Sequence, residues 1–181
     1  MRYFAVILIA FATLISCGGV RKKSATPQAV EPTFYTYEVV AEYPHLRTSY
    51  TQGLQFVDGE LWEGTGEYGR SQLLRTDLAS GKVLQSKKLS KEEFGEGITV
   101  LGDNIYQLTW LNGKLHTYDK ATLRHLATHT YKGEGWGLTT DGEKLYMSDG
   151  TNFIRVINPE TMTQERRFGV NLRGQSLRNL N

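Results

Sequence analysis

The chain repeats one pattern of apolar and polar positions three times. Each copy opens with a glycine and alternates between apolar and polar residues up to a turn rich in Gly, Asp and Asn. A second short apolar run then follows. The opening glycines are Gly53, Gly97 and Gly137, which stand 44 and then 40 residues apart. Such alternation between turn-forming residues is typical of β-strands with one buried face. The pattern therefore predicts three copies of a β-hairpin.

Each copy continues beyond its hairpin into two further short strands. A third apolar stretch ends at Asp77, Asp119 or Asn158, and a turn and a fourth stretch follow it. Because these residues recur at equivalent places, we interpret them as turn-formers rather than catalysts. Four short strands per period of about 40 residues are typical of a β-propeller blade. The predicted fold class is all-β, a β-propeller of four-stranded blades.

Residues 34–181 are predicted to form this propeller domain. From residue 51 to Asn181 the chain holds about 3.3 repeats, which gives three blades and the start of a fourth. Because propellers typically close with at least four blades, we expect the sequence to be C-terminally incomplete. Residues 34–43 also have strand character. We expect them to pair, as a lone strand, with the blade formed by the far end of the chain, which would cover two strand edges.

The first 33 residues have a different character. An apolar run at residues 4–15 follows a single basic residue and precedes small residues around Cys17. The run is shorter than the roughly 20 residues that a membrane-spanning helix needs. It predicts a lipoprotein signal peptide at residues 1–16, with Cys17 as the lipidated residue; an ordinary signal peptide that contains a cysteine is the alternative. Residues 17–33 are polar and predicted to be a flexible tether. The expected location is the cell envelope, lipid-anchored and facing the periplasm or the cell surface.

Charge and motif content argue against several other functions. The net charge is only +2 and basic clusters are short, so nucleic-acid binding has little support. The Gly-x-Gly-x-x-Gly motif at residues 64–69 would need a following helix to bind a dinucleotide, and we interpret it as a strand connection. His125 and His129 would lie about 13 Å apart on one strand. No metal ligands and no cofactor are therefore predicted.

The residue before each repeat glycine is the best candidate for chemistry. These residues are Gln52, Glu96 and Trp136, and the repeat spacing adds Asn181. The innermost strand of a blade starts at the mouth of the central channel, so all four are expected on one rim. Packing alone would keep them alike, but they are two amides, an acid and an indole. This favours a binding or catalytic pocket, with solvated loop residues as the alternative.

Six short motifs add a specific resemblance. They are Tyr50-Thr51-Gln52-Gly53-Leu54, Glu67-Tyr68-Gly69-Arg70-Ser71, Phe94-Gly95-Glu96-Gly97-Ile98, Gln107-Leu108-Thr109-Trp110, Gly133-Glu134-Gly135-Trp136-Gly137-Leu138 and Asn179-Leu180-Asn181. In order and spacing they closely resemble the glutamine cyclotransferases of the plant and bacterial type. The resemblance extends from about residue 37 to the end of the chain. It implies a five-bladed propeller that converts N-terminal glutamine of peptides or proteins to pyroglutamate, with release of ammonia.

The resemblance also implies roles for individual residues. Five residues match active-site positions of the family: Gln52, Glu96, Trp110, Trp136 and Asn181. Tyr50 stands at a pocket-wall position where the family usually has phenylalanine.

A mechanism follows from the chemistry of these residues. Glu96 is expected to have its pKa raised by desolvation beside the two tryptophans and to carry the proton from the attacking amine to the leaving ammonia. Gln52 and Asn181 are expected to donate amide hydrogens to the developing oxyanion. The alternative is a non-catalytic propeller lipoprotein that binds peptides or envelope proteins.

Overall fold

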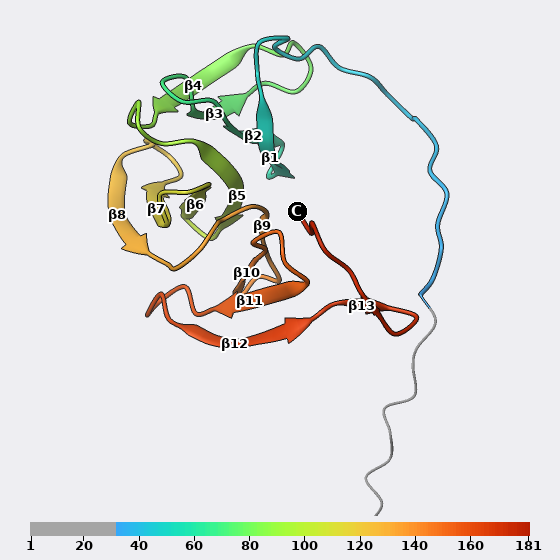
Figure 1. Ribbon diagram of the computed structural model, residues 1–181. Coiled ribbons are helices and arrows are strands. Elements are labelled where there is room, and N and C mark those ends of the chain that lie inside the picture. The colour runs from blue at the N-terminus through green and yellow to red at the C-terminus, as the bar shows by residue number, and fades with distance from the viewer. Residues whose placement is uncertain (1–31) are drawn as a thin grey trace, which may run out of the picture. The chain divides into compact units, whose positions relative to one another are not determined.

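A computed structural model describes residues 32–181 of the chain (Figure 1), of which Phe34–Asn181 make up one compact unit. The signal peptide predicted at residues 1–16, the lipidated Cys17 and nearly all of the tether predicted at residues 17–33 lie outside the described residues. Within residues 32–181, no helix is long and apolar enough to cross a membrane.

Three four-stranded antiparallel sheets follow one another along the chain, and in each the strands are hydrogen-bonded in chain order. The first blade consists of β1 (Thr51–Val57), β2 (Glu60–Thr65), β3 (Gln72–Thr76) and β4 (Val83–Lys88). The second consists of β5 (Gly95–Leu101), β6 (Asn104–Thr109), β7 (Lys114–Asp119) and β8 (His125–Thr130). The third consists of β9 (Leu138–Thr140), β10 (Leu145–Met147), β11 (Phe153–Ile157) and β12 (Gln164–Gly169). A short pair, β13 (Asn171–Leu172) and β14 (Gln175–Ser176), follows them.

The three blades are arranged around a common centre (Figure 1). The first strand of each blade, β1, β5 or β9, faces this centre, and the fourth, β4, β8 or β12, lies outside. Exposure follows the same order in the second blade, where β5 and β6 are almost wholly buried and β8 is mostly exposed. The predicted propeller of four-stranded blades is therefore confirmed.

The repeat glycines lie where the inner strands of neighbouring blades meet. A Cβ atom on Gly53 would come within 2.5 Å of the Ile98 nitrogen, and one on Gly97 within 2.5 Å of the Leu138 nitrogen. The Gly97 N–H also donates a 2.8 Å hydrogen bond to the Trp136 carbonyl of the next blade. Because any side chain would collide with backbone, only glycine permits this approach.

The hydrophobic core lies between the blades rather than within one sheet. One cluster joins the first two blades and contains Trp62, Leu73, Ile98, Val100, Ile105, Tyr118 and Leu123. A second joins the second and third blades and contains Tyr106, Leu108, Leu115, Leu138, Leu145, Met147 and Ile157. Burial of apolar area on both faces of the middle blade therefore fixes the distance between neighbouring inner strands.

The turn that follows the third strand of each blade confirms the assignment of the recurring Asp and Asn residues. Oδ1 of Asp77 accepts a 2.9 Å hydrogen bond from the Ser80 N–H, and Oδ1 of Asp119 accepts a 2.8 Å bond from the Thr122 N–H. Asn158 accepts from the N–H groups two and three residues on. The glycine-rich motif at residues 64–69 runs from the end of β2 into the turn before β3, so it is the strand connection that was predicted.

The expectation of a strand at residues 34–43 is wrong for this structure. These residues form no strand, and their side chains are exposed, including Phe34 at 76% and Tyr35 at 87%. A strand needs a neighbour that satisfies its backbone hydrogen bonds. Each of the three described blades already holds four strands of residues 51–169, and none of them pairs with this segment.

Candidate active site

One cavity of about 360 Å³ collects all six residues predicted for the site. Its lining consists of Tyr50, Gln52, Phe94, Glu96, Trp110, Trp136 and Asn181. The predicted common rim for residues 52, 96, 136 and 181 is therefore present in the structure. Phe94 is the one lining residue that was not predicted as part of the site.

Two of these residues lie at irregularities of their strands. The β1–β2 ladder shifts between Thr51 and Gly53, so Gln52 is an extra residue on β1. The β5–β6 ladder shifts in the same way between Gly95 and Ile98, which places Glu96 inside the irregularity. A bulge bends a strand and changes the direction of the side chain that it carries. The same device thus turns an amide and a carboxyl toward the cavity from two neighbouring blades.

Glu96 is buried between closely packed backbone segments. Its side chain is 7% exposed, and a Cβ on the preceding Gly95 would come within 2.6 Å of the Thr65 carbonyl oxygen. Burial raises the pKa of the Glu96 carboxyl to about 8, and the negative charge of Glu134 adds to the rise. The predicted direction of this pKa shift is correct, although the contribution of a second carboxylate was not foreseen.

The two tryptophans of the cavity share one acceptor. Indole Nε1 of Trp110 donates to Oε2 of Glu134 over 2.7 Å, and Nε1 of Trp136 donates to the same oxygen over 2.9 Å. These two hydrogen bonds lower the pKa of Glu134. At neutral pH the site therefore holds one carboxylate, Glu134, beside one carboxyl group that is mostly protonated, Glu96.

Phe94 joins the aromatic side chains around the cavity. Its ring meets Tyr50, Tyr68 and Trp110 edge-on, with centroids 6.2, 5.5 and 5.7 Å away. Such edge-to-face pairs add to the stabilisation from buried area. The backbone carbonyl of Phe94 also accepts a 2.9 Å hydrogen bond from the Trp110 N–H. This apolar wall lowers the local polarity in which Glu96 ionises.

Asn181 lies against the third repeat glycine. A Cβ on Gly137 would come within 2.8 Å of the Asn181 carbonyl carbon, so Asn181 occupies the place that the next inner strand has at Gly53 and Gly97. A larger cavity of about 610 Å³ adjoins the first and shares Gln52 and Asn181 with it. Its further lining is mainly glycine and apolar residues of the inner strands, so the chemistry is concentrated in the smaller cavity.

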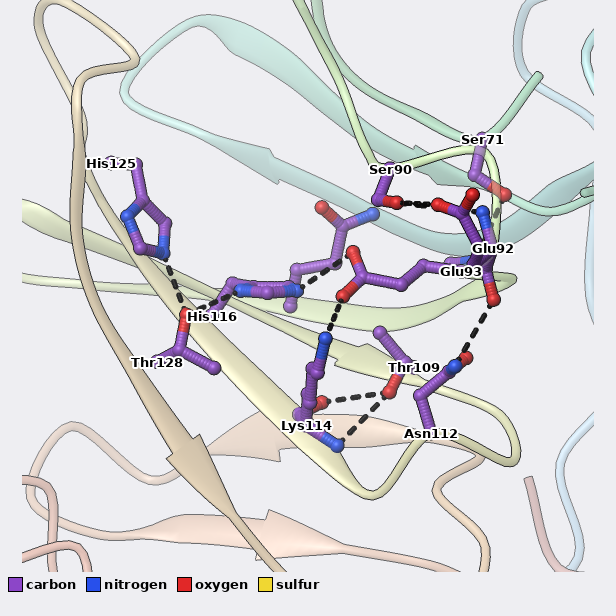
Figure 2. Close-up of polar contacts among 12 residues, drawn as sticks. Ser71, Ser90, Glu92, Glu93, Thr109, Asn112, Lys114, His116, His125 and Thr128 are labelled. Atoms are coloured by element: carbon purple, nitrogen blue, oxygen red, sulfur yellow. Dashed lines mark hydrogen bonds and ion pairs between the residues drawn. The ribbon is translucent and has the colours of Figure 1, made fainter. Parts of the chain in front are cut away.

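A polar cluster within the second blade supports the start of β5 (Figure 2). Glu93 accepts hydrogen bonds from Nζ of Lys114 at 2.7 Å and from Nε2 of His116 at 3.1 Å. Nδ1 of His116 lies 2.9 Å from the hydroxyl of Thr128, which is also 2.8 Å from Nε2 of His125. Burial lowers the pKa of His116, so the neutral ring donates to Glu93 through Nε2 and accepts from Thr128 through Nδ1.

Comparison with known proteins decides the family. The family model described as glutamine cyclotransferase matches residues 9–181. The chain belongs to the glutamine cyclotransferase family. A glutaminyl-peptide cyclotransferase of Arabidopsis thaliana is 41% identical over 147 residues, which cover 80% of this chain and 46% of that protein. This member of the family therefore spans about half the length of its Arabidopsis relative.

Solved structures agree with the family and the fold. The glutaminyl cyclase of Myxococcus xanthus matches with a TM-score of 0.70 and 34% identity, over 77% of this chain and 59% of that one. The WD40 domain of Neurospora crassa Pan2 matches with a TM-score of 0.56 and 11% identity, over 66% of this chain and 36% of that one. The second likeness concerns the propeller fold alone.

Two residues at or beside the cavity were not predicted from the sequence: Phe94, which lines it, and Glu134, which binds both of its indoles. A signal for Glu134 was present, because it stands between Gly133 and Gly135 as Glu96 stands between Gly95 and Gly97. Phe94 directly precedes the first of these Gly-Glu-Gly triplets. Residues 32–181 contain no group of three or more His, Cys, Asp or Glu side chains that could hold a metal ion.

Proposed function

We propose that this protein is a glutaminyl-peptide cyclotransferase that converts N-terminal glutamine of peptides or proteins to pyroglutamate. The observation that carries the proposal is the buried carboxyl of Glu96, with a pKa of about 8, in a cavity of about 360 Å³ walled by indole rings. Family membership supports it, since the Arabidopsis relative is a glutaminyl-peptide cyclotransferase and the Myxococcus structure is a glutaminyl cyclase.

The reaction is an intramolecular amide transfer. The α-amine nitrogen of the substrate bonds to the Cδ carbon of its own side chain, and the bond from Cδ to the amide nitrogen breaks. The products are a five-membered lactam and ammonia. Because nucleophile and electrophile belong to one residue, the enzyme has to hold the folded-back conformer and move protons. The aromatic walls of Phe94, Trp110 and Trp136 suit the first task.

Glu96 is proposed to perform the second task. It takes the proton that the amine loses and gives a proton to the departing nitrogen, so that neutral ammonia leaves. A single group can do both only if its acid and base forms are close in free energy near the working pH. A pKa of about 8 meets this condition. Amide groups of Gln52 and Asn181, which line the same cavity, are proposed to donate hydrogen bonds to the carbonyl oxygen as it gains charge.

An ammonia-release assay tests the proposal. Purified protein is mixed with a peptide that begins with glutamine, and ammonia is measured by a coupled enzyme reaction. The matched control is the same peptide with an acetylated α-amine, which cannot cyclise. We expect the peptide with a free α-amine to release ammonia and to lose the mass of one ammonia molecule. The acetylated peptide should do neither. Saturable binding of the peptide without ammonia release would instead support the non-catalytic, peptide-binding alternative.

We further propose that the protein is lipid-anchored in the cell envelope through Cys17 and faces the periplasm or the cell surface. The support is the apolar run at residues 4–15 followed by small residues around the single cysteine. Metabolic labelling with a radioactive fatty acid tests it in cells that express the protein. Label should be incorporated by the wild type and lost in Cys17→Ser; equal labelling of both would refute the anchor.

A further inference from the structure

The carboxylate of Glu134 connects the two indoles of the cavity, although they come from different parts of the chain. Trp110 follows β6 in the second blade, whereas Trp136 directly precedes the third repeat glycine. Both indole N–H groups point to one oxygen, Oε2 of Glu134, at 2.7 and 2.9 Å. A carboxylate oxygen can accept two such bonds, and bonds to a charged acceptor are stronger than neutral ones.

The backbone around Glu134 is held firmly. Gly133 has a left-handed conformation with φ of +86°, and a Cβ on Gly135 would overlap the Tyr131 hydroxyl at 2.0 Å. The Gly135 N–H donates to the Trp110 carbonyl over 3.0 Å. Nη1 of Arg155 donates to the Lys132 carbonyl over 2.8 Å. With the backbone fixed on both sides, the direction in which the Glu134 side chain leaves the backbone is fixed, and the two indole hydrogen bonds hold its carboxylate.

We propose that Glu134 is a positioning residue of this site, whose carboxylate fixes the indoles of Trp110 and Trp136 by their N–H groups and so sets the two walls beside Glu96. The effect of this placement on turnover rests on the proposed cyclotransferase function, whereas the placement of the two indoles by Glu134 does not. A tryptophan ring can otherwise rotate about two side-chain bonds, and misplacement of a wall by about 1 Å can cost on the order of a hundredfold in rate.

The charge of Glu134 gives the same residue a second effect. A carboxylate near Glu96 disfavours ionisation of that second carboxyl, which agrees with the raised pKa of Glu96. Glu134 itself is kept ionised by the two indole donors, which lower its pKa. The three groups are therefore coupled: the indoles hold Glu134 as an anion, and the anion helps to hold Glu96 as an acid.

Nuclear magnetic resonance of the indole N–H groups tests the structural part without any need for turnover. The protein contains three tryptophans, so three indole signals are expected. Trp110→Phe and Trp136→Phe assign them. The third, Trp62, is an internal control, because its fully buried Nε1 has no hydrogen-bond partner in the described part of the chain. In Glu134→Ala the indole N–H signals of Trp110 and Trp136 should both move upfield, and their protons should exchange faster with solvent. The signal of Trp62 should keep its chemical shift and exchange rate.

A pH titration of the wild type sharpens this test. The signals of Trp110 and Trp136 should move together at one midpoint below 4.5, the ordinary pKa of a glutamate, because Glu134 is the group that titrates. Glu143→Gln is the matched control variant, since Glu143 is an exposed glutamate of the third blade. It should change none of the three signals. If either cavity indole fails to respond to Glu134→Ala in a folded protein, the inference is wrong.

Turnover tests the catalytic consequence. Glu134→Ala should lower kcat for a glutamine-initiated peptide by roughly tenfold to a hundredfold, with a smaller change in KM, because wall placement matters most in the transition state. Glu134→Gln keeps the shape of the side chain and removes its charge. It should therefore retain more activity than Glu134→Ala. It should also lower the pKa of Glu96, as seen in the pH profile of turnover and in the carboxyl carbon signal of Glu96.

Unchanged kcat in both variants, despite displaced indole signals, would refute the effect of Glu134 on turnover. Absence of ammonia from the wild type would count against the proposed function instead, and the indole signals would still decide the positioning role.

Discussion

Glu93 and Glu96 stand three residues apart where the chain enters β5, and their carboxyl groups have opposite pKa shifts. Both side chains are buried, with 4% and 7% exposure. Burial raises the pKa of each. At Glu93 the hydrogen bond from Lys114 and the pairing with His116 outweigh burial, so the pKa of Glu93 is lowered. At Glu96 the neighbouring charge is the carboxylate of Glu134, and the pKa rises to about 8.

The comparison shows that partners, rather than burial, decide the charge of a buried carboxyl. Lys114 and His116 both belong to β7, so Glu93 is an anion that connects the start of β5 to its own blade (Figure 2). Glu96 lies within the irregularity of β5 and lines the cavity instead. One carboxyl is structural and charged at neutral pH, because its pKa is lowered, and the other can exchange a proton near neutral pH. Single substitutions at three positions, Glu96, Lys114 and Glu92, test this contrast.

Glu96→Gln should have the largest effect, on activity. A glutamine has nearly the same shape but cannot transfer a proton, so turnover of a glutamine-initiated peptide should fall by about 10²–10⁴-fold. Peptide affinity, measured by fluorescence titration, should change little because the walls of the cavity remain. Glu93→Gln, the same chemical change three residues earlier, should lower turnover far less. Equal losses in the two variants would contradict the assignment of proton transfer to Glu96.

Glu96→Gln should also change how stability depends on pH. Below pH 4.5 the carboxyl is protonated in the folded and unfolded chain alike, so it adds no pH dependence to the free energy of unfolding. Between pH 4.5 and about 8 the unfolded chain loses the proton and the folded one keeps it, so the free energy of unfolding falls as pH rises. The loss amounts to at most about 4–5 kcal/mol. Glu96→Gln has no carboxyl at this position, so its free energy of unfolding should not show this loss.

Urea unfolding at pH 5 and pH 9 measures this effect. The two proteins should be similar in stability at pH 5, and Glu96→Gln should be the more stable at pH 9. Glu134→Gln is an informative comparison, because it lowers the pKa of Glu96 without removing that carboxyl and should therefore recover part of the difference. A wild type that gains stability relative to Glu96→Gln as pH rises would show that the carboxyl is not held as an acid.

Much of the fold could be predicted because the repeat glycines report packing between blades directly. Gly53, Gly97 and Gly137 each stand where a Cβ would collide with the next segment, so the spacing of one residue type records the spacing of the blades. The residue before each of these glycines is then predicted to stand at the mouth of the central channel, where an inner strand begins. Gln52, Glu96, Trp136 and Asn181 could thus be assigned to one rim from the sequence alone, and all four line one cavity.

The parts that escaped prediction depend on contacts between segments without a repeat. Glu134 reaches its indole partners only through a loop conformation set by Gly133, Tyr131 and Arg155, which no periodicity reveals. The strand expected at residues 34–43 failed for a related reason. Alternation predicts that a segment can pair, but a strand forms only where a neighbour satisfies its backbone hydrogen bonds, and none of the described strands pairs with these residues.

Lys114→Met should have a smaller effect than either change at Glu96, and on stability alone. Methionine keeps the length of the side chain but removes the 2.7 Å hydrogen bond and the charge that hold Glu93. The half-exposed position of Lys114 screens this interaction, so the free energy of unfolding at pH 7 should fall by about 1–2 kcal/mol. Because the pKa of Glu93 is lowered in the folded protein, the difference should disappear as pH falls through that pKa.

The control for Lys114→Met is the double variant with Glu93→Gln. If the pair acts as described, adding the second substitution should restore part of the lost stability, since an unpaired buried carboxylate is replaced by a neutral amide. Additive losses in the double variant would mean that Lys114 stabilises β7 in some way other than through Glu93. Turnover should change little in the single variant, because the cavity lining is untouched.

Glu92→Gln should have the smallest effect, and it separates a pKa shift from a contribution to stability. The pKa of Glu92 is lowered, as that of Glu93 is, but here the first cause is a hydrogen bond from the Ser90 hydroxyl at an exposed position. Water replaces such a bond in the unfolded chain at little cost. Neither the midpoint of thermal unfolding at pH 7 nor turnover should differ from the wild type. If Glu92→Gln instead lowered the unfolding midpoint as much as Lys114→Met does, the whole acidic turn before β5 would have to act as a unit, and the partners of Glu93 alone would no longer explain the contrast with Glu96.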